Sequence, residues 1–311
     1  MRTDGGSPER PGRHLRPVPG PAVATGRGMT SAWSYEPSDL ARIKSQAGLT
    51  VSVCLPARNE ERTIRSIVET IRGELQESVG LVDELIVFDD GSVDATAQAA
   101  VCAGAMVIAV DDVLSEFGPG LGKGDVLWRS LAASTGELVV WCDSDIVEFG
   151  AQFVYGLLGP MLTAECVEFV KGAFDRPAFG GMGGGRVTEL LARPLLSLVR
   201  PDLGFIDQPL SGSYAGRRTT LEQLSFETDF GVDVGLLLDV ADLVGPDAIA
   251  QVHLGEFRHQ HRPLAELAGQ ANSVARAILS RYGDAGDGAS AVLRPPIAST
   301  RRTEPARASV L

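Results

Sequence analysis

Apolar residues along this chain alternate between short β-rich runs and longer stretches with helical spacing. In the first half, four runs predict strands, at residues 50–55, 84–90, 106–110 and 138–142. A helix after the first run is indicated by apolar residues about one turn apart, Ile64, Ile67, Val68 and Ile71. Residues 94–103 predict another helix. Because strands that alternate with such helices form βαβ units, the pattern predicts an α/β fold with a Rossmann-like, mainly parallel sheet flanked by helices.

The second half continues this pattern and carries a glycine cluster at residues 180–185. Two further strands are predicted at 167–173 and 249–254, and three helices near 187–199, 232–243 and 264–282. No internal repeat recurs at a fixed period. We therefore expect these elements to extend the same sheet.

Both ends of the chain lack an apolar period. Residues 1–32 are rich in Gly, Pro and Arg, and residues 286–311 turn to Pro, Arg, Ser and Thr. Neither segment offers enough apolar surface to offset the entropy of ordering it. We expect a flexible N-terminal arm, a folded body and a flexible tail, with Met1 and Met29 both open as the start of the protein.

The composition fits one enzyme-sized globular domain. The 311 residues are 44% hydrophobic and 22% charged, which allows one large core or two modest ones. No apolar run approaches the roughly 18 residues of a membrane-spanning helix, and the basic N-terminus lacks the apolar centre of a secretory signal. We expect a cytoplasmic protein. The four cysteines lie far apart and indicate neither a disulfide framework nor a zinc site.

The formal net charge of −12 argues against broad attraction to nucleic acid or to anionic lipid. An anionic substrate would therefore need positive charge that the fold concentrates locally. Candidate sources are a bound metal and the side chains of Lys123, Arg186, Arg258 and Arg262.

Two acids follow the predicted strand 138–142. Asp143 and Asp145 are two residues apart, so in extended chain both carboxylates could face one ligand. Hard oxygen donors of this kind suit Mg²⁺ or Mn²⁺ bridging a diphosphate. Alone the signal is weak, because acids also cap or turn the end of a strand.

Two other loops, at residues 56–60 and 89–92, end predicted strands in the same way. Asp89, Asp90 and Gly91, taken singly, are a turn signal. In a parallel sheet, however, ligands bind beyond the carboxyl ends of the strands, where all three loops would emerge. The order of PARNEE, DDGSVDAT and WCDSD along the chain is therefore a stronger signal than any one of them.

Glycines surround Lys123 at residues 118–124. The loop is not a Walker A loop, because Gly124 and Asp125 stand where Ser or Thr would be required. Its backbone N–H groups and the lysine ammonium could meet a diphosphate at a helix N-terminus. The alternative is a mobile surface loop.

A second glycine-rich segment, residues 180–190, holds Arg186 and Thr188. Glycines permit close backbone approach, the arginine can fork onto a phosphate or carboxylate, and the threonine adds a hydroxyl. The segment would suit a second anionic group. The alternative is a flexible linker.

Three remaining candidates have an ordinary structural explanation as well. His259 and His261 lie among arginines and could be part of a solvated polar strand, although one imidazole could complete a metal site begun by Asp145. Asp233 could be a simple acid in the first turn of a helix.

From about residue 34 to 282 the chain resembles the actinobacterial glucosyl-3-phosphoglycerate and mannosyl-3-phosphoglycerate synthases, a retaining GT-A glycosyltransferase family. The resemblance rests on PARNEE, VDELIVFDDGS, GKGDVLWRSLA, DSD, GGGRVTELLARPLL, QPLSGSYA and HQHRPL. It implies a GT-A fold in which residues 33–148 bind the nucleotide sugar and residues 149–285 bind the acceptor. It also implies a homodimer and Mg²⁺ or Mn²⁺ as cofactor.

The resemblance assigns roles residue by residue. The nucleotide sugar would be bound by Pro56, Ala57, Arg58, Glu60, Asp90, Lys123, Asp143, Ser144 and Arg262. The phosphoglycerate acceptor would be bound by Gly185, Arg186, Thr188 and His261. The metal would be held by Asp145 and His259, and catalysis would involve Leu210, Asp233 and Lys123.

Several positions depart from the glucosyl-type pattern: Arg58 replaces leucine, Asp90 serine, Asp233 glutamate, Phe257 arginine and His261 asparagine. A carboxylate at position 90 could accept from the N1–H and N2 amine of guanine, a pair of donors that uracil lacks. We therefore expect a GDP-sugar donor, GDP-mannose with GDP-glucose tolerated, and 3-phosphoglycerate as acceptor.

The expected reaction moves the hexose to the 2-hydroxyl of 3-phosphoglycerate, the first step toward mannosylglycerate or glucosylglycerate as compatible solutes. One alternative is the same transfer from UDP-glucose. A second is a polyprenyl-phosphate glycosyltransferase, for which the chain shows no lipid-facing element. A third, of another class, is a catalytically silent nucleotide-sugar-binding scaffold.

Overall fold

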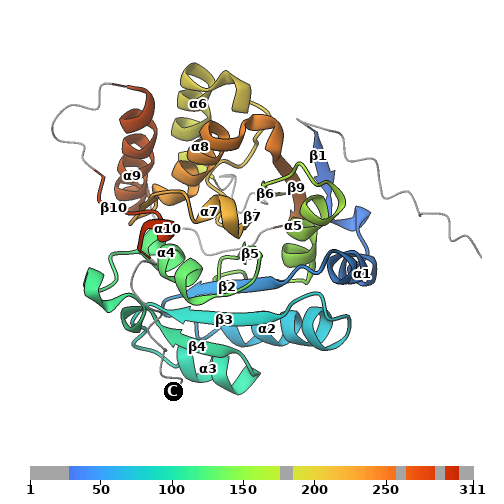
Figure 1. Ribbon diagram of the computed structural model, residues 1–311. Helices are drawn as coiled ribbons and strands as arrows, with labels where there is room; N and C mark the ends of the chain where they lie inside the picture. The colour runs from blue at the N-terminus through green and yellow to red at the C-terminus, as the bar shows by residue number, and fades with distance from the viewer. Residues whose placement is uncertain (1–27, 176–184, 257–263, 284–290, 301–311) are drawn as a thin grey trace, which may run out of the picture.

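The computed structural model describes residues 28–175, 185–256, 264–283 and 291–300. The strands of its main sheet are β1 Met29–Ser31, β2 Val51–Ala57, β3 Glu84–Asp89, β4 Met106–Ala109, β5 Leu138–Trp141, β6 Phe169–Asp175, β7 Tyr214–Arg217 and β9 Ile249–Glu256 (Figure 1). Their order is β1-β9-β6-β7-β5-β2-β3-β4. Among these strands only β7 runs antiparallel to its neighbours, β5 and β6, so the predicted mainly parallel sheet is confirmed.

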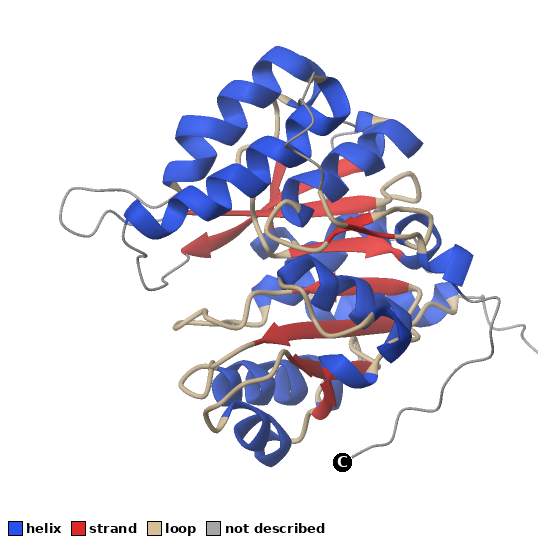
Figure 2. Cartoon of the chain, turned by 90° about the vertical axis from the view of Figure 1, so that its left-hand side faces the viewer, coloured by secondary structure: helices blue, strands red, loops and turns tan. Residues whose placement is uncertain are grey.

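Helices cover both faces of this sheet (Figure 2). They are α1 Pro37–Ala47, α2 Ile64–Thr70, α3 Thr96–Ala103, α4 Lys123–Ala133, α5 Gln152–Thr163, α6 Arg193–Val199, α7 Arg218–Leu221, α8 Val232–Val244, α9 Leu264–Tyr282 and α10 Ile297–Thr300. Two π-helical stretches, Ile71–Glu77 and Thr188–Ala192, adjoin α2 and α6. Short 3₁₀ turns occur at Ala32–Ser34, Val110–Asp112, Ser115–Phe117, Pro201–Leu203 and Pro246–Ala248.

Successive side chains of the central strands face two different cores. In β2, Val53 and Leu55 pack with α1, α2, α3 and α5. Cys54, between them, packs with the opposite core on α4, α6, α8 and α9. Burial of one aliphatic side chain stabilises the fold by roughly 1.5–3 kcal/mol, so the alternation fixes the register of the strand.

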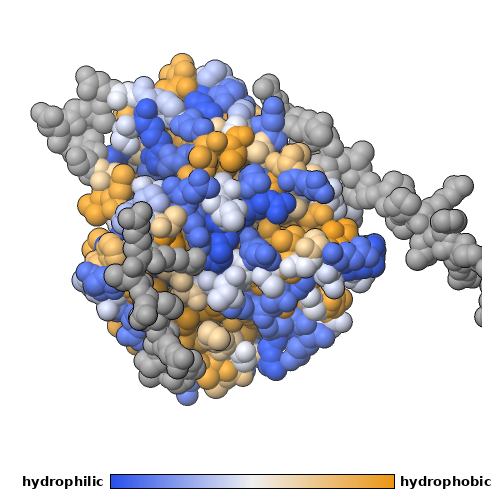
Figure 3. All heavy atoms as spheres, in the orientation of Figure 1, coloured by the Kyte–Doolittle hydropathy of each residue, from blue (hydrophilic) through white to orange (hydrophobic). Residues whose placement is uncertain are grey.

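None of the helices in the described ranges combines the length and apolarity that a membrane crossing requires. On the face seen in Figure 3, hydrophobic residues are scattered among hydrophilic ones.

The helical periodicity after the first predicted strand is confirmed. The predicted apolar positions, Ile64, Ile67, Val68 and Ile71, are all fully buried in α2 and the π-helical stretch that follows it.

Residues 29–31, which the composition placed in the flexible arm 1–32, instead form β1. This strand pairs in parallel with β9, where Met29 lies opposite Gln251 and Ser31 opposite His253. The prediction was wrong because backbone hydrogen bonds at the edge of a sheet, and not an apolar period, hold this segment.

Part of the predicted tail 286–311 is also packed. A second sheet joins β10 Leu293–Arg294 to β8 Phe226–Glu227 in antiparallel pairing. The guanidinium of Arg294 donates to both carboxylate oxygens of Asp125, at 2.6 and 2.9 Å, and the side chain of Asp125 is fully buried. The Trp128 indole donates to the Pro295 carbonyl at 2.7 Å. Composition missed this segment because long-range contacts, a strand pairing, an ion pair and a hydrogen bond, hold it in place.

Candidate active site

The carboxyl ends of β2, β3 and β5 bring the three predicted loops together. The Asp90 backbone N–H donates to the Ala57 carbonyl at 2.9 Å, which joins the loop after β3 to the end of β2. The Ser144 hydroxyl donates to the Pro56 carbonyl at 2.8 Å, which joins the loop after β5 to the same strand. The parallel sheet thus places all three loops at one edge.

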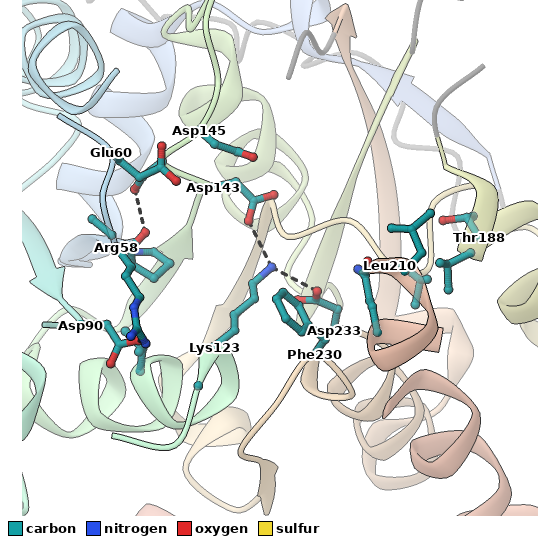
Figure 4. Close-up of a pocket in the computed structure, with 18 of the residues that line it drawn as sticks. Arg58, Glu60, Asp90, Lys123, Asp143, Asp145, Thr188, Leu210, Phe230 and Asp233 are labelled. Atoms are coloured by element: carbon teal, nitrogen blue, oxygen red, sulfur yellow. Dashed lines mark hydrogen bonds and ion pairs between the residues drawn. The ribbon is translucent and has the colours of Figure 1, made fainter. Parts of the chain in front are cut away.

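A cavity of about 440 Å³ opens at this edge, a size typical of small-molecule sites. Every predicted site residue that the structure describes lines it: Pro56, Ala57, Arg58, Glu60, Asp90, Lys123, Asp143, Ser144, Asp145, Gly185, Arg186, Thr188, Leu210 and Asp233. His259, His261 and Arg262 lie outside the described residues, as does Arg258. Figure 4 shows Arg58 and Asp90 across the cavity from Leu210 and Thr188, with Lys123 between them.

Lys123, the first residue of α4, joins two carboxylates at the centre of the cavity. Its ammonium lies 3.1 Å from Asp143 Oδ1 and 3.1 Å from Asp233 Oδ2. Burial by itself would lower the pKa of Lys123, but the two carboxylates outweigh it and raise the pKa above that of a free lysine. Burial also raises the pKa of Asp233, which Lys123 opposes only in part. Two carboxylates therefore share one ammonium that stays charged at neutral pH.

Two glycines allow close packing of the backbone in and beside this cluster. A Cβ on Gly212 would collide with the Asp143 carboxylate and the Lys123 ammonium. A Cβ on Gly124 would collide with the carbonyl of Glu227, at the end of β8. The turn into α4 is therefore packed against β8, unlike the mobile surface loop that was the alternative prediction for this segment.

Arg58 and Asp90 form an ion pair at the side of the cavity predicted to bind the nucleobase. Arg58 Nη1 lies 3.3 Å from Asp90 Oδ2, and the arginine side chain is 65% exposed. Burial raises the pKa of Asp90, and the arginine partly offsets this effect. The carboxylate that the sequence predicts as a guanine acceptor therefore already has a cationic partner.

The predicted acceptor residues line the other part of the cavity. Gly185 has a left-handed φ of 82°, which lets the chain turn into the stretch Thr188–Ala192. Arg186 also lines the cavity, and Thr188 is 3% exposed. Six lining residues were not predicted individually, although Gly122 and Val187 lie in the two predicted glycine-rich segments: Gly122, Val126, Val187, Phe230, Leu267 and Gln270.

The helical period of the sequence did carry a signal for two of these residues. Leu267 and Gln270 lie three residues apart on α9, so they share one face of a helix that the sequence does predict. The helical period shows which residues share a face, but it does not show which wall of a cavity that face forms.

The donor atoms at the end of β5 fit a hard divalent cation. Asp143 and Asp145 both line the cavity, and Mg²⁺ or Mn²⁺ prefers carboxylate oxygens. Within the described ranges, no three His, Cys, Asp or Glu side chains gather as a metal site. The described residues thus supply part of a ligand set, and the predicted pairing of Asp145 with His259 stays a prediction.

Residues 52–168 match the model of glycosyl transferase family 2. Over 255 residues the chain is 51% identical to glucosyl-3-phosphoglycerate synthase of Mycolicibacterium smegmatis, which covers 80% of this chain and 82% of that protein. Glucosyl-3-phosphoglycerate synthase from Mycobacterium tuberculosis, solved with Mn²⁺ and UDP-glucose, has a TM-score of 0.79 at 43% identity and covers 86% and 96% of the two chains. Mannosyl-3-phosphoglycerate synthase from Rubrobacter xylanophilus has a TM-score of 0.81 at 35% identity and covers 88% and 97%.

These likenesses confirm the predicted GT-A fold and the predicted family resemblance. The curated relative and the solved complex support the glucosyl alternative better than the mannosyl reaction with a GDP-sugar that was the main prediction. With identity above half over four-fifths of its length, this chain is a glycosyltransferase and belongs to the glucosyl-3-phosphoglycerate synthase family.

Proposed function

We propose that this chain transfers glucose from UDP-glucose to the 2-hydroxyl of 3-phosphoglycerate, with retention of the anomeric configuration. The observation that carries the proposal is a single cavity with cations for two anionic reactants, Lys123 beside the strand ends and Arg186 close to Thr188. The M. tuberculosis relative has been solved with Mn²⁺, UDP-glucose and phosphoglyceric acid together. A cavity of this kind suits the same three components.

UDP-glucose takes the place of the GDP-sugar first expected from Asp90. That expectation uses the Asp90 carboxylate for the two donors of guanine. Arg58 lies 3.3 Å from Oδ2, so the base would share this carboxylate with a cation. The single N3–H of uracil asks for one acceptor only, and the relatives of this chain support UDP-glucose. GDP-mannose is the second candidate, since the Asp90 carboxylate keeps acceptor capacity that guanine can use and the mannosyl enzyme from R. xylanophilus has the same fold.

Lys123 stabilises the leaving group. Negative charge builds on the diphosphate as its bond to the sugar breaks, and a preorganised ammonium lowers the energy of that charge. A divalent metal, held by Asp145 and His259, would supply further neutralisation of the diphosphate. In the same scheme Asp233 binds sugar hydroxyls and the Leu210 carbonyl lies near the reacting carbon.

The structure disfavours Asp233 as a nucleophile. Its Oδ2 accepts from Lys123 at 3.1 Å and its Oδ1 accepts from the Tyr214 hydroxyl at 3.3 Å. We therefore assign the acceptor proton to the departing phosphate oxygen, while Arg186 and Thr188 hold the acceptor phosphate for attack on the same face. A covalent glucosyl adduct on Asp233, trapped and detected by mass spectrometry, would refute this route.

The test is turnover by the purified full chain with 3-phosphoglycerate and Mg²⁺, with UDP-glucose, GDP-glucose and GDP-mannose offered separately. We expect the highest kcat/KM with UDP-glucose, loss of turnover in excess chelator, and little turnover with glycerate, which lacks the phosphate. A clear preference for GDP-mannose would replace the donor assignment. Transfer only to a polyprenyl phosphate would indicate a lipid-linked glycosyltransferase instead, and no transfer from any donor would indicate a nucleotide-sugar-binding scaffold.

Three further expectations belong to the same proposal and follow from the family resemblance. They are a homodimer, a cytoplasmic location, and a product that feeds compatible-solute synthesis. Light scattering of the purified protein tests the first of them directly.

A further inference from the structure

Lys171 is a fully buried lysine in the middle of β6, with no exposed surface. Its amino group donates to the Ser211 carbonyl at 2.7 Å and to the backbone carbonyl of Asp233 at 3.0 Å. It also lies 4.3 Å from the centre of the Tyr214 ring, on the neighbouring strand. A buried amino group is stable only when its donors are satisfied, and these three contacts satisfy them.

One of the two carbonyls follows a residue that lines the cavity, and the other belongs to a lining residue, Asp233. Ser211 directly follows Leu210, whose carbonyl is expected near the reacting carbon. Asp233 is in the first turn of α8 and lines the cavity, where the proposed function expects the sugar. Lys171 therefore joins a turn to a helix by binding two carbonyls 22 residues apart in sequence, one next to Leu210 and one on Asp233, two residues that line the cavity.

Tyr214 strengthens this link from the side. Its hydroxyl donates to the carboxylate of Asp233, while its ring covers the amino group of Lys171. Asp233 is thus held through both its backbone and its side chain, and Lys123 holds the other carboxylate oxygen. A displacement of either carbonyl from Lys171 would move Asp233, Leu210 or both.

We propose that Lys171 is a positioning residue for glucosyl transfer, which fixes the Leu210 carbonyl and the Asp233 carboxylate relative to each other by binding the carbonyls of Ser211 and Asp233. It touches neither reactant. The inference rests on the function proposed above. Since a misplacement of about 1 Å can reduce a rate by roughly a hundredfold, loss of this link acts on kcat.

Lys44 provides a matched control for a purely structural role. It is also buried, at 5% exposure, and its ammonium donates to the Gly80 carbonyl at 2.8 Å and to the Asp83 carboxylate at 2.8 Å. None of these residues lines the cavity. Lys171→Met and Lys44→Met therefore each remove a buried amino group that donates to a main-chain carbonyl, but only the first does so beside the proposed sugar site.

The experiment compares wild type, Lys171→Met and Lys44→Met in Tm, in the Kd of UDP, and in kcat with UDP-glucose and 3-phosphoglycerate at a temperature where all three are folded. Both variants are expected to lose thermal stability and to keep the wild-type Kd of UDP within about threefold, because UDP lacks the sugar. Only Lys171→Met is expected to lose kcat, by about ten- to a hundredfold.

A kcat of Lys171→Met close to the wild-type value, with a lowered Tm, would overturn the inference and leave Lys171 a structural residue. If Lys171→Met does not fold, Lys171→Gln, which keeps an N–H donor, is compared in the same way and is expected to lose kcat by a smaller factor; wild-type kcat in that variant would equally overturn the inference. A wild-type protein without turnover would refute the proposed function itself, which is a distinguishable result.

Discussion

The guanidinium of Arg58 lies 3.3 Å from the carboxylate of Asp90, so the two residues that are predicted from the sequence to lie beside the nucleobase form one ion pair. The arginine is mostly exposed, and exposed pairs stabilise proteins by only about 0–1 kcal/mol. The consequence of the pair concerns ligand binding, because a nucleobase at this side of the cavity would share the Asp90 carboxylate with Arg58.

Asp90→Ser tests this consequence for the donor. Guanine can use a carboxylate through two N–H groups and uracil through one, so loss of the carboxylate removes more from guanine. We expect kcat/KM with GDP-glucose to fall about tenfold further than kcat/KM with UDP-glucose. The double variant Arg58→Leu/Asp90→Ser is the matched control, because Asp90→Ser alone leaves Arg58 without its carboxylate partner. An equal loss for both donors would show that Asp90 does not face the base.

Arg186→Gln tests the acceptor end of the cavity. This variant would lose the guanidinium contact that we propose for the acceptor phosphate, whereas the residues proposed to bind the nucleotide are unchanged. We expect the KM for 3-phosphoglycerate to rise about ten- to a hundredfold, with the Kd of UDP unchanged. Glycerate serves as control substrate, since its weak turnover should not depend on Arg186. A changed Kd of UDP instead would place Arg186 at the donor.

Arg294→Met tests the role of the C-terminal segment 291–300. The carboxylate of Asp125 is fully buried and loses one of its two cationic partners, while Arg129 remains at 3.2 Å. We expect the free energy of unfolding to fall by about 3 kcal/mol, measured by urea denaturation. Arg65→Met removes an exposed ion pair with Glu69 and should change the free energy of unfolding by no more than about 0.5 kcal/mol. Equal losses of stability in the two variants would contradict the conclusion that Arg294 anchors the segment 291–300.

The lowered pKa of the buried Lys171 leads us to predict that the stability of the protein depends on pH. Burial lowers its pKa to about 7; Asp233 and Asp143 oppose this shift, Lys123 adds to it, and the Tyr214 ring packs against the amine. An unfolded lysine titrates near 10.4, so between about pH 7 and 10 the unfolded state binds more protons. The free energy of unfolding therefore rises with pH across this window, and the contribution of Lys171 to it is lowest at the acidic end.

The measurement is the Tm of wild type minus that of Lys171→Met, followed from about pH 6 to 9. We expect the difference to shift in favour of the wild type as pH rises. A difference that stays constant would mean that Lys171 keeps its proton throughout and that its pKa is not lowered.

The parts of the fold that follow a local period were predictable from sequence. The apolar spacing of α2 and the runs of β2, β3 and β5 are set by burial on the two faces of the sheet. Once those strands are parallel, their loops must share one edge, which is why the described candidate residues meet in one cavity.

Elements held by long-range contacts were not predictable in this way. The strand β7 is only four residues long and pairs antiparallel between β5 and β6, which no local pattern reports. The helix α5 is apolar on most sides and contains Gly156 and Gly159, which let Ala32 and Tyr35 pack closely. Lys171 looks like a solvent-facing residue of a strand until its two carbonyl partners are known.

The most direct test of the proposed reaction is the identity of the product made from UDP-glucose and 3-phosphoglycerate, determined by NMR and mass spectrometry. We predict one glucose joined in the α configuration to the 2-hydroxyl of 3-phosphoglycerate, with UDP released in equal amount. A β linkage, attachment to another position, or release of free glucose without transfer would contradict it.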